Sequence, residues 1–483
     1  MVTKEFETIL NLFVEKINEN IDKNIIIIAR KSSDGLAAGS LISSVLLKLD
    51  TRITLRLEND LDSDLISRIV LENHDLNIFI DFSFKEFSKI NNLLKNKFVI
   101  INHDICPKDL KDYDGKIINP YLYGIDGIAE ITSCGLTFLL AERIGRANKK
   151  LSMLAIVSAL AEKQNIGPKK SLIGLNSEIA SIATSIGILN MKADLIFNNL
   201  DYKPLHEALA YNISPYIEGI TWNKENCYKI LKSTGIVTHR NGKFRTFAEI
   251  SDQEKNMILD AITKFIFLSN PKNEKENDNI ENISDSFIGY IFEFPNEDRN
   301  SILKNGMEFA FALNSCIKYE KIGLGIGICM GERYNTVTEI EKIVFDYKTN
   351  IMNCLEKIFR EKWRLLDNDS TVFVNGEGIL NEGITNDISI ILSESISFKT
   401  KLLFLRTLSN DNSYNFYVKK GIEYATKKEL TSTLQEYLKH DYRIEKNLND
   451  DIIVNVPYSM IEEFSSVIRK RISKNENTEE QRI

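Results

Sequence analysis

Three short polar segments of this sequence carry side chains of the kinds that bind divalent metal ions. Asp34 and Asp81 supply carboxylates, and the triplet Asn102-His103-Asp104 supplies an imidazole between an amide and a carboxylate. Carboxylate oxygens and imidazole nitrogens are ligands for Mn²⁺ and Mg²⁺. One such residue by itself is usually an ordinary loop residue. Three of them in similar settings indicate a shared site.

Each of these segments follows a short apolar run. The runs are residues 25–28, 76–80 and 98–101. Runs rich in Ile and Val that alternate with helical patterns predict buried parallel strands. Ligands of open parallel sheets bind at the carboxyl ends of the strands. We therefore expect the three polar segments to converge at one edge of one sheet.

Length and composition limit the class of protein. The chain has 483 residues, of which 43% are apolar, which is enough for two to four domains with cores of their own. The net charge of −7 excludes a protein that is basic overall, although a local basic groove remains compatible with it. The six cysteines lie far apart without a C-x-x-C pair, and no apolar run approaches the roughly 18 residues of a membrane span. These features predict a soluble cytoplasmic protein with reduced thiols.

The pattern of residues predicts the order of the elements. Residues 3–22 indicate an amphipathic helix, and strand and helix patterns then alternate to about residue 165, which is typical of an α/β layer with a parallel sheet. The polar run 270–279 predicts a loop. A long periodic helix is expected over 335–365, where neither Pro nor Gly interrupts the pattern.

Two further segments are interpreted as strands. The glycines that alternate with apolar residues in 322–328 lack the spacing of a phosphate loop, so they favour a tightly packed strand after a helix over 307–313. Residues 388–392 and 401–408 predict the first strands of a second α+β unit that ends near residue 472.

The order of these clusters resembles the DHH phosphoesterase superfamily. The whole chain, with Asn314-Ser315-Cys316 ahead of the glycine-rich segment, is similar to the archaeal RecJ-like branch of that superfamily. This branch includes the GINS-associated nucleases and resembles the eukaryotic cell-division-cycle protein of the CMG helicase. Its active members hold two manganese or magnesium ions with a His-x-Asp-x-Asp-Gly loop, a lone Asp, an Asp-His-His triplet and an Asp on a later helix.

Matched to those motifs, this sequence has lost several ligands. The first loop has Arg30 for the His and Ser32 for the first Asp, and it keeps Asp34. Asn102 and Asp104 replace the outer residues of the triplet. The retained or substituted ligand positions are Asp34, Asp81, His103 and Glu162.

These replacements predict that one metal site is lost. Two-metal hydrolysis requires both cations. Ser32 is a weak neutral ligand, and the guanidinium of Arg30 cannot be deprotonated to coordinate a metal. The resemblance therefore implies at most one residual Mn²⁺ or Mg²⁺ site, held by Asp34, Asp81, His103 and Glu162, and no required cofactor.

The resemblance also implies a C-terminal unit that binds nucleic acid with a Gly-Gly-His loop. The matching stretch keeps His440, beside Lys439 and Arg443. Leucine and lysine in place of glycines prevent the backbone from approaching a phosphate closely. His440 is equally well interpreted as an ordinary histidine at a helix end.

The predicted domains follow the family's order. We expect a parallel-sheet DHH domain over 1–190, a mainly α-helical insertion over 191–330 that docks partners, a linking helix over 331–366, an α+β DHH-associated domain over 367–473 and a flexible tail over 474–483.

Two functions remain open from the sequence. The first is a catalytically inactive replication factor that binds GINS and the MCM ring, with single-stranded DNA as a further partner and a cytoplasmic, nucleoid-associated location. The second is a metal-dependent exonuclease or phosphodiesterase that uses one metal, with Arg30 and Lys31 as cationic substitutes. The lost ligands favour the first, so enzyme activity is not expected.

Overall fold

The computed structural model describes residues 4–112, 115–197, 203–269, 286–368, 370–409, 412–421, 443–446 and 452–466. Its contacts divide the chain into two compact units. The first comprises residues 1–202 and 288–345, and the second comprises residues 203–287 and 346–483. Residues 288–330, which fall within the predicted insertion, thus belong to the first unit. Each unit is described by itself below.

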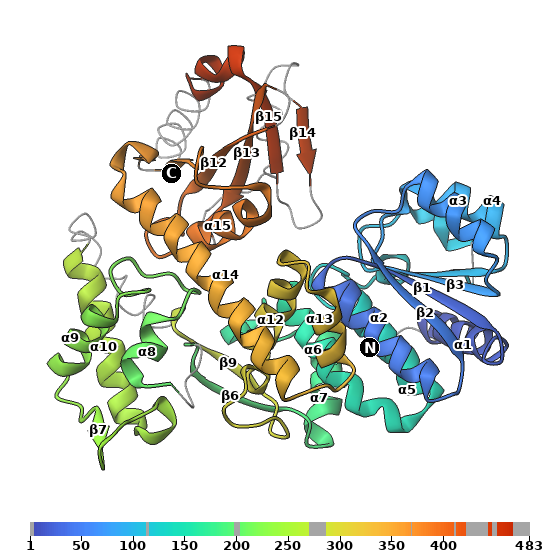
Figure 1. Cartoon of the computed structure of the whole chain (residues 1–483), viewed down its shortest axis with the longest axis horizontal. Helices are drawn as coiled ribbons and strands as arrows, with labels where there is room; N and C mark the ends of the chain where they lie inside the picture. Colours follow the sequence, from blue (N-terminus) through green and yellow to red (C-terminus); the bar gives the residue numbers. More distant parts are fainter. Residues whose placement is uncertain are drawn as a thin grey trace, which may run out of the picture. The chain divides into compact units, whose positions relative to one another are not determined.

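The first unit is built on a five-stranded parallel sheet in the order β2-β1-β3-β4-β5 (Figure 1). Its strands are β1 (Asn24–Arg30), β2 (Arg52–Glu58), β3 (Leu76–Ile80), β4 (Phe98–Ile101) and β5 (Ile117–Ile118). The helices around it are α1 (Lys4–Asn18), α2 (Ser33–Leu47), α3 (Ser63–Glu72), α4 (Phe87–Leu94), α5 (Ser133–Ile144), α6 (Ser152–Ala161) and α7 (Gly174–Ser185). The predicted α/β layer with a parallel sheet is confirmed.

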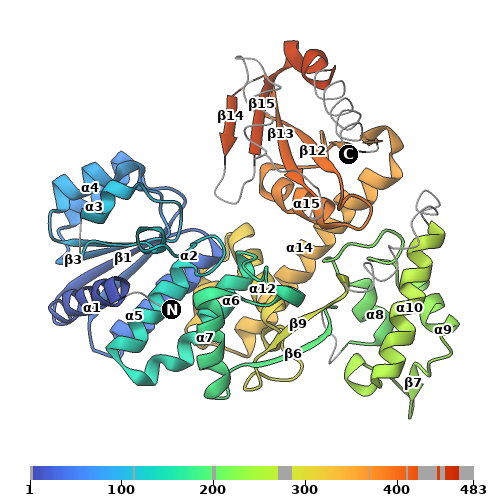
Figure 2. The same ribbon diagram turned by 180° about the vertical axis from the view of Figure 1, so that it is seen from behind.

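Both faces of this sheet are covered at its central strands, which explains why β1, β3 and β4 are mostly apolar. The edge strand β2 is only partly buried and carries Arg52, Arg56 and Glu58. Alternate residues of β1 enter different cores: Ile25 and Ile27 pack on the side of α1, α2 and α5, whereas Ile26 and Ile28 pack on the side of α3 and α4. Figure 2 shows α1, α5, α6 and α7 from the side opposite to Figure 1. In the central strands, polar groups can therefore reach solvent only at the strand ends.

The chain leaves and re-enters the first unit through an antiparallel ribbon of two strands. These are β6 (Asn190–Leu195) and β9 (Ile288–Glu293), which pair from Asn190 with Glu293 to Leu195 with Ile288. After β9 come α12 (Gly306–Lys318), α13 (Ile322–Cys329) and α14 (Asn335–Arg360). The predicted helix over 335–365 is confirmed and ends at Arg360.

The second unit has a helical part and a sheet part. The helical part contains α8 (Leu205–Ala210), α9 (Lys224–Ser233), α10 (Asp252–Ser269) and a hairpin of β7 (His239–Arg240) and β8 (Lys243–Phe244). The sheet part has the mixed order β10-β11-β12-β13-β15-β14 and one long helix. These elements are β10 (Leu365–Asp367), β11 (Thr371–Asn375), α15 (Glu382–Glu394), β12 (Leu402–Leu408), β13 (Ser413–Lys420), β14 (Arg443–Lys446) and β15 (Ile452–Pro457). A mainly helical insertion and a C-terminal α+β domain are thus both present.

The strand predicted over 322–328 is wrong, because this segment forms α13. The sequence alternates glycine and apolar residues, which mimics the period of a strand. One of these glycines, Gly325, packs against α2, since a Cβ atom added there would lie 2.8 Å from Leu36 Cδ1, whereas a Cβ atom added at Gly323 would meet nothing within 4 Å.

The strand predicted over 388–392 is also wrong, because this segment lies inside α15. The buried apolar residues of α15 are Ile384, Ile388, Ile391 and Leu392, which are spaced as one face of a helix. A short apolar run does not by itself distinguish a buried helix from a strand. The loop predicted over 270–279 lies outside the described residues.

Candidate metal centre

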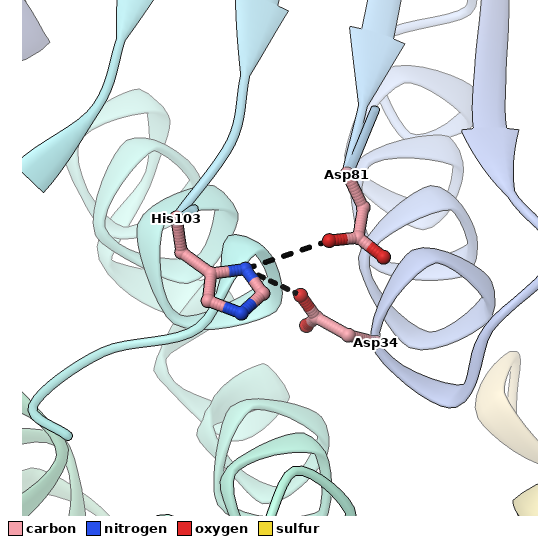
Figure 3. A group of neighbouring side chains, drawn as sticks. All are labelled: Asp34, Asp81 and His103. Carbon is pink, nitrogen blue, oxygen red and sulfur yellow. Dashed lines mark ion pairs between the residues drawn. The ribbon is translucent and has the colours of Figure 1, made fainter. Parts of the chain in front are cut away.

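Three predicted ligands meet at the carboxyl edge of the first sheet (Figure 3). Asp34 lies in the first turn of α2, directly after β1, whereas Asp81 follows β3 and His103 follows β4. His103 Nδ1 is 3.3 Å from Asp34 Oδ2 and 3.4 Å from Asp81 Oδ1. One ligand atom from each residue lies within 4.8 Å of the other two, and all three side chains are buried. The expected convergence is therefore present.

Asp81 has an unusual backbone conformation. Its φ of 67° lies in the left-handed region, which aspartate tolerates better than most residues. Its backbone N–H donates to the carbonyl of Ile101 at the end of β4 (2.9 Å), which holds the strained residue in place. Backbone strain of this kind clusters at functional sites.

The carboxylate of Asp34 accepts three hydrogen bonds from within the protein. Oδ2 accepts from the backbone N–H of Ser133 (2.9 Å). Oδ1 accepts from the N–H of Cys134 (2.8 Å) and the hydroxyl of Ser158 (2.5 Å). The two N–H groups belong to the first turn of α5, where a negative charge is favourable. Asp34 thus joins α2 to α5 and α6 as well as facing the imidazole.

Hydroxyl groups surround the carboxylate of Asp81. Ser32 caps α2 by accepting from Gly35 N–H (2.9 Å), and its hydroxyl donates to Asp81 Oδ2 (2.7 Å). The hydroxyl of Ser133 lies 3.3 Å from Asp81 Oδ1 and 2.9 Å from His103 Nδ1. The motif that this loop resembles has an aspartate at the position of Ser32, and that aspartate binds a metal ion. In this chain Ser32 instead donates a hydrogen bond to the carboxylate of Asp81.

The remaining residues of the triplet hold the end of β4 together. The Asn102 amide donates to Phe82 O (2.8 Å) and Asp104 Oδ2 (3.2 Å), and its oxygen accepts from Asp104 N–H (2.7 Å). The Asn119 amide also donates to Asn102 Oδ1 (3.1 Å). Asp104 Oδ1 lies 4.0 Å from His103 Nε2, so both ring nitrogens face carboxylates.

Burial and crowded charges shift the protonation of this site. Burial, followed by repulsion from Asp34, raises the pKa of Asp81 to about 7, although His103 and Arg30 partly oppose the rise. Burial and Asp34 likewise raise the pKa of Glu162, again against His103 and Arg30. Burial alone would lower the pKa of His103, but the surrounding carboxylates raise it. Arg30 thus supplies a fixed positive charge to this acidic site.

The other predicted site residues are placed less centrally. Glu162 follows α6 and does not belong to the group of three, so its role as a ligand stays a prediction. His440 and Lys439 lie outside the described residues, and Arg443 begins β14. Ser133, Ser158 and Asn119 were not predicted as site residues. The Thr132-Ser133 start of α5 was the only sequence signal for the hydrogen bonds to Asp34.

The group suits one divalent cation. Two carboxylates and an imidazole match the ligand preferences of Mn²⁺ and Mg²⁺, and each has an atom close enough to share one ion. A second ion would need further carboxylates, where this chain has Ser32 and Arg30. The residues present can therefore hold a single ion.

The raised pKa values predict how stability changes with pH when chelator removes metal. Between about pH 4 and 7, the folded protein retains a proton on Asp81 that the unfolded chain releases. His103 contributes in the same direction, because its stabilisation is complete below its ordinary pKa and is lost as pH rises through the higher folded value. The free energy of unfolding should therefore fall by a few kcal/mol as pH rises from 5 to about 7.5.

Hydrogen exchange of peptides from β1 and α2, corrected for intrinsic rates, measures this change. Tryptophan fluorescence would not serve, because Trp222 and Trp363 both belong to the second unit. The Asp81→Asn variant should show a weaker dependence on pH. Protection that increases from pH 5 to 7.5 would contradict the expected sign.

Comparisons with known proteins place this site in a known fold. Residues 200–280 match the DHH-CID domain family. An uncharacterized protein of Methanocaldococcus jannaschii is 26% identical over 400 residues, covering 80% of this chain and 84% of that protein.

Solved structures resemble the chain over almost its whole length. CDC45 from Entamoeba histolytica has a TM-score of 0.58 at 13% identity and covers 96% of this chain and 98% of its own. RecJ from Thermus thermophilus, in complex with Mn²⁺, has a TM-score of 0.53 at 12% identity and covers 98% of this chain and 55% of that longer protein. The chain therefore has the fold of RecJ and CDC45. In the described part of the chain, no helix is both long and apolar enough to span a membrane.

Proposed function

We propose that this chain, which has the DHH fold in the form found in RecJ and CDC45, is a replication factor that lacks nuclease activity and acts through its partners. The hydrogen bond from Ser32 to Asp81 carries this proposal. It places a neutral donor against the carboxylate where two-metal catalysis needs another anionic ligand. Arg30 adds a permanent cation to the same site, so part of the charge that metal would balance is already balanced.

A residual ion remains compatible with this role. Asp34, Asp81 and His103 would hold one Mn²⁺ or Mg²⁺, which when bound activates water as a Lewis acid. The hydrogen bonds to Asp34 come from within the protein, so the fold around the site does not depend on that ion.

The first test is activity. We expect no Mn²⁺-dependent degradation of labelled single-stranded DNA or RNA by the purified chain above the level of its Asp81→Ala variant. Denaturing gels over a time course measure this, with an active RecJ as the positive control. Digestion that the Asp81→Ala substitution abolishes would refute the proposal.

The second test concerns partners. We propose GINS and the MCM ring, because the family resemblance that implies lost catalysis implies these partners as well. The purified chain and GINS should elute together from gel filtration at micromolar concentration and moderate salt. Two separate peaks would contradict this part of the proposal and leave the activity test unaffected.

The surviving group of three ligands also supports a second candidate, a one-metal nuclease or phosphodiesterase. In that candidate, the side chains of Arg30 and Lys31 would supply the positive charge that a second metal ion supplies in a two-metal site. Lys31 is less suited to this role, because its ammonium forms an ion pair with Glu320. The loop is further fixed by the Ser33 hydroxyl, which donates to Asn314 on α12. The activity test above separates the two candidates.

A further inference from the structure

A strongly basic segment lies in the helical part of the second unit. Residues 224–245, which span α9 and the β7–β8 hairpin, contain a single carboxylate, Glu225. The cations of this segment are Lys224, Lys229, Lys232, Arg240, Lys243 and Arg245. Lys224, Lys229 and Arg245 are paired with Glu207, Glu225 and Glu254. In a chain with a net charge of −7, the cations left without an ion pair among the described residues, Lys232, Arg240 and Lys243, indicate a surface for an anionic ligand.

Aromatic and histidine rings gather at the same place. Phe244 of the hairpin lies 3.8 Å from the His239 ring and 5.0 Å from the His206 ring of α8, between centroids. Tyr228 of α9 meets His206 edge to face at 6.1 Å. Phe244 and Tyr228 are each 43% exposed. We call the four rings His206, Tyr228, His239 and Phe244 the ring cluster; Figure 1 shows that α8, α9 and β7 lie together.

A tight turn fixes the hairpin that carries two of these rings. Asn241 and Gly242 have φ values of 53° and 76°, which is the geometry of a two-residue type I′ turn. The resulting register pairs Arg240 with Lys243 directly across the two strands. Like charges opposite one another destabilise a hairpin. The tip of the hairpin therefore breaks a local rule of folding.

In the described part of the chain, no carboxylate forms an ion pair with either cation at the tip of the hairpin. Both cations, Arg240 and Lys243, are exposed. The nearby carboxylates are engaged elsewhere: Glu207 with Lys224, Glu225 with Lys229, Glu249 with the backbone of Thr246, and Glu254 with Arg245. A bound anion would relieve the repulsion that the protein leaves in place.

We propose that this hairpin and the ring cluster form a binding platform for single-stranded nucleic acid. Exposed rings offer faces and edges to unpaired bases, and the two cations at the tip offer contacts to phosphates. An acidic peptide would use the cations alone, whereas a single strand uses cations and rings together. The platform belongs to the second unit, whereas the metal centre belongs to the first. The proposed binding therefore does not depend on whether the metal centre is active.

Binding of a fluorescein-labelled oligothymidylate of about 20 nucleotides to the full chain, followed by anisotropy, tests this proposal. The Arg240→Gln, Lys243→Gln double variant should bind about tenfold more weakly at low salt and show a smaller dependence on salt concentration. Phe244→Leu, which keeps an apolar side chain without a ring, should weaken binding about fivefold. The matched control Lys357→Gln, Lys362→Gln removes two exposed cations elsewhere in the same unit and should bind like the parent.

Thermal unfolding separates a binding role from a structural one. Because the double variant removes the like-charge pair, its melting temperature without nucleic acid should equal or exceed that of the parent. Unchanged affinity in the double variant or in Phe244→Leu would overturn the proposal. Displacement of the oligonucleotide by poly-glutamate at equal charge concentration would overturn it as well, in favour of an acidic protein partner.

Discussion

Replacing Asp34 with alanine is expected to lower the free energy of unfolding of the first unit by about 3–5 kcal/mol. The Asp34 carboxylate is fully buried and accepts hydrogen bonds from Ser133 N–H, Cys134 N–H and the Ser158 hydroxyl. Alanine would leave these donors without their acceptor, and each buried donor without a partner costs about 1–3 kcal/mol. Hydrogen exchange of peptides from α2 and α5 measures the loss.

Two control variants separate this effect from general damage to the site. Ser158→Ala removes one of the three hydrogen bonds and should cost about 1 kcal/mol. Asp81→Asn should be neutral or stabilising in metal-free protein at pH 8, because burial opposes the ionised form of Asp81 and asparagine also tolerates its positive φ. If Asp34→Ala cost no more than Ser158→Ala, Asp34 would not hold the helices together as described.

Restoring two lost ligands should make the protein depend on metal. The Arg30→His, Ser32→Asp variant removes the guanidinium of Arg30 and places a carboxylate beside Asp81. The two carboxylates repel each other unless a metal ion lies between them. At free Mn²⁺ one hundred times above the dissociation constant, binding should stabilise this variant by about 2.7 kcal/mol, or about 5 °C in melting temperature. The parent should gain less, because it has fewer anionic ligands.

The matched control is Arg30→His, Ser32→Asn, which has a similar shape without the added charge. Aspartate and asparagine are both good helix N-caps, so the cap of α2 should survive in both variants. Differential scanning fluorimetry with and without Mn²⁺ compares them. An equal gain in the two variants would mean that residue 32 does not face the ion.

The central part of the fold follows from short-range patterns in the sequence. The apolar run over residues 25–28 identifies β1 because strands buried on both faces need no polar alternation. The same reasoning fails for 388–392, where an equally short run belongs to α15. There the 3.6-residue spacing of Ile384, Ile388 and Ile391 was the better guide. In α13 the pattern was misleading, because alternating glycines imitate the period of a strand. One of them, Gly325, packs against Leu36, which lies far away along the chain.

The same distinction applies to the candidate site. Asp34, Asp81 and His103 could be brought together from the sequence because a parallel sheet places its strand ends at one edge. The partners of Asp34 could not, since Ser133 and Ser158 lie 99 and 124 residues away and belong to no motif. The sequence therefore identified Asp34 as a candidate ligand. Only the tertiary structure showed that Asp34 also accepts hydrogen bonds from α5 and α6.

The ribbon of β6 and β9 holds together the two ends of the segment that connects these strands. Leu195 and Ile288 are a cross-strand pair, so the two ends of the segment between them lie about 5 Å apart. A short turn could close that gap, and segments of other lengths could be joined there without moving the parallel sheet. The stretch that matches the DHH-CID family lies wholly between these two residues. This segment can therefore change in length or sequence while the first unit keeps its own core.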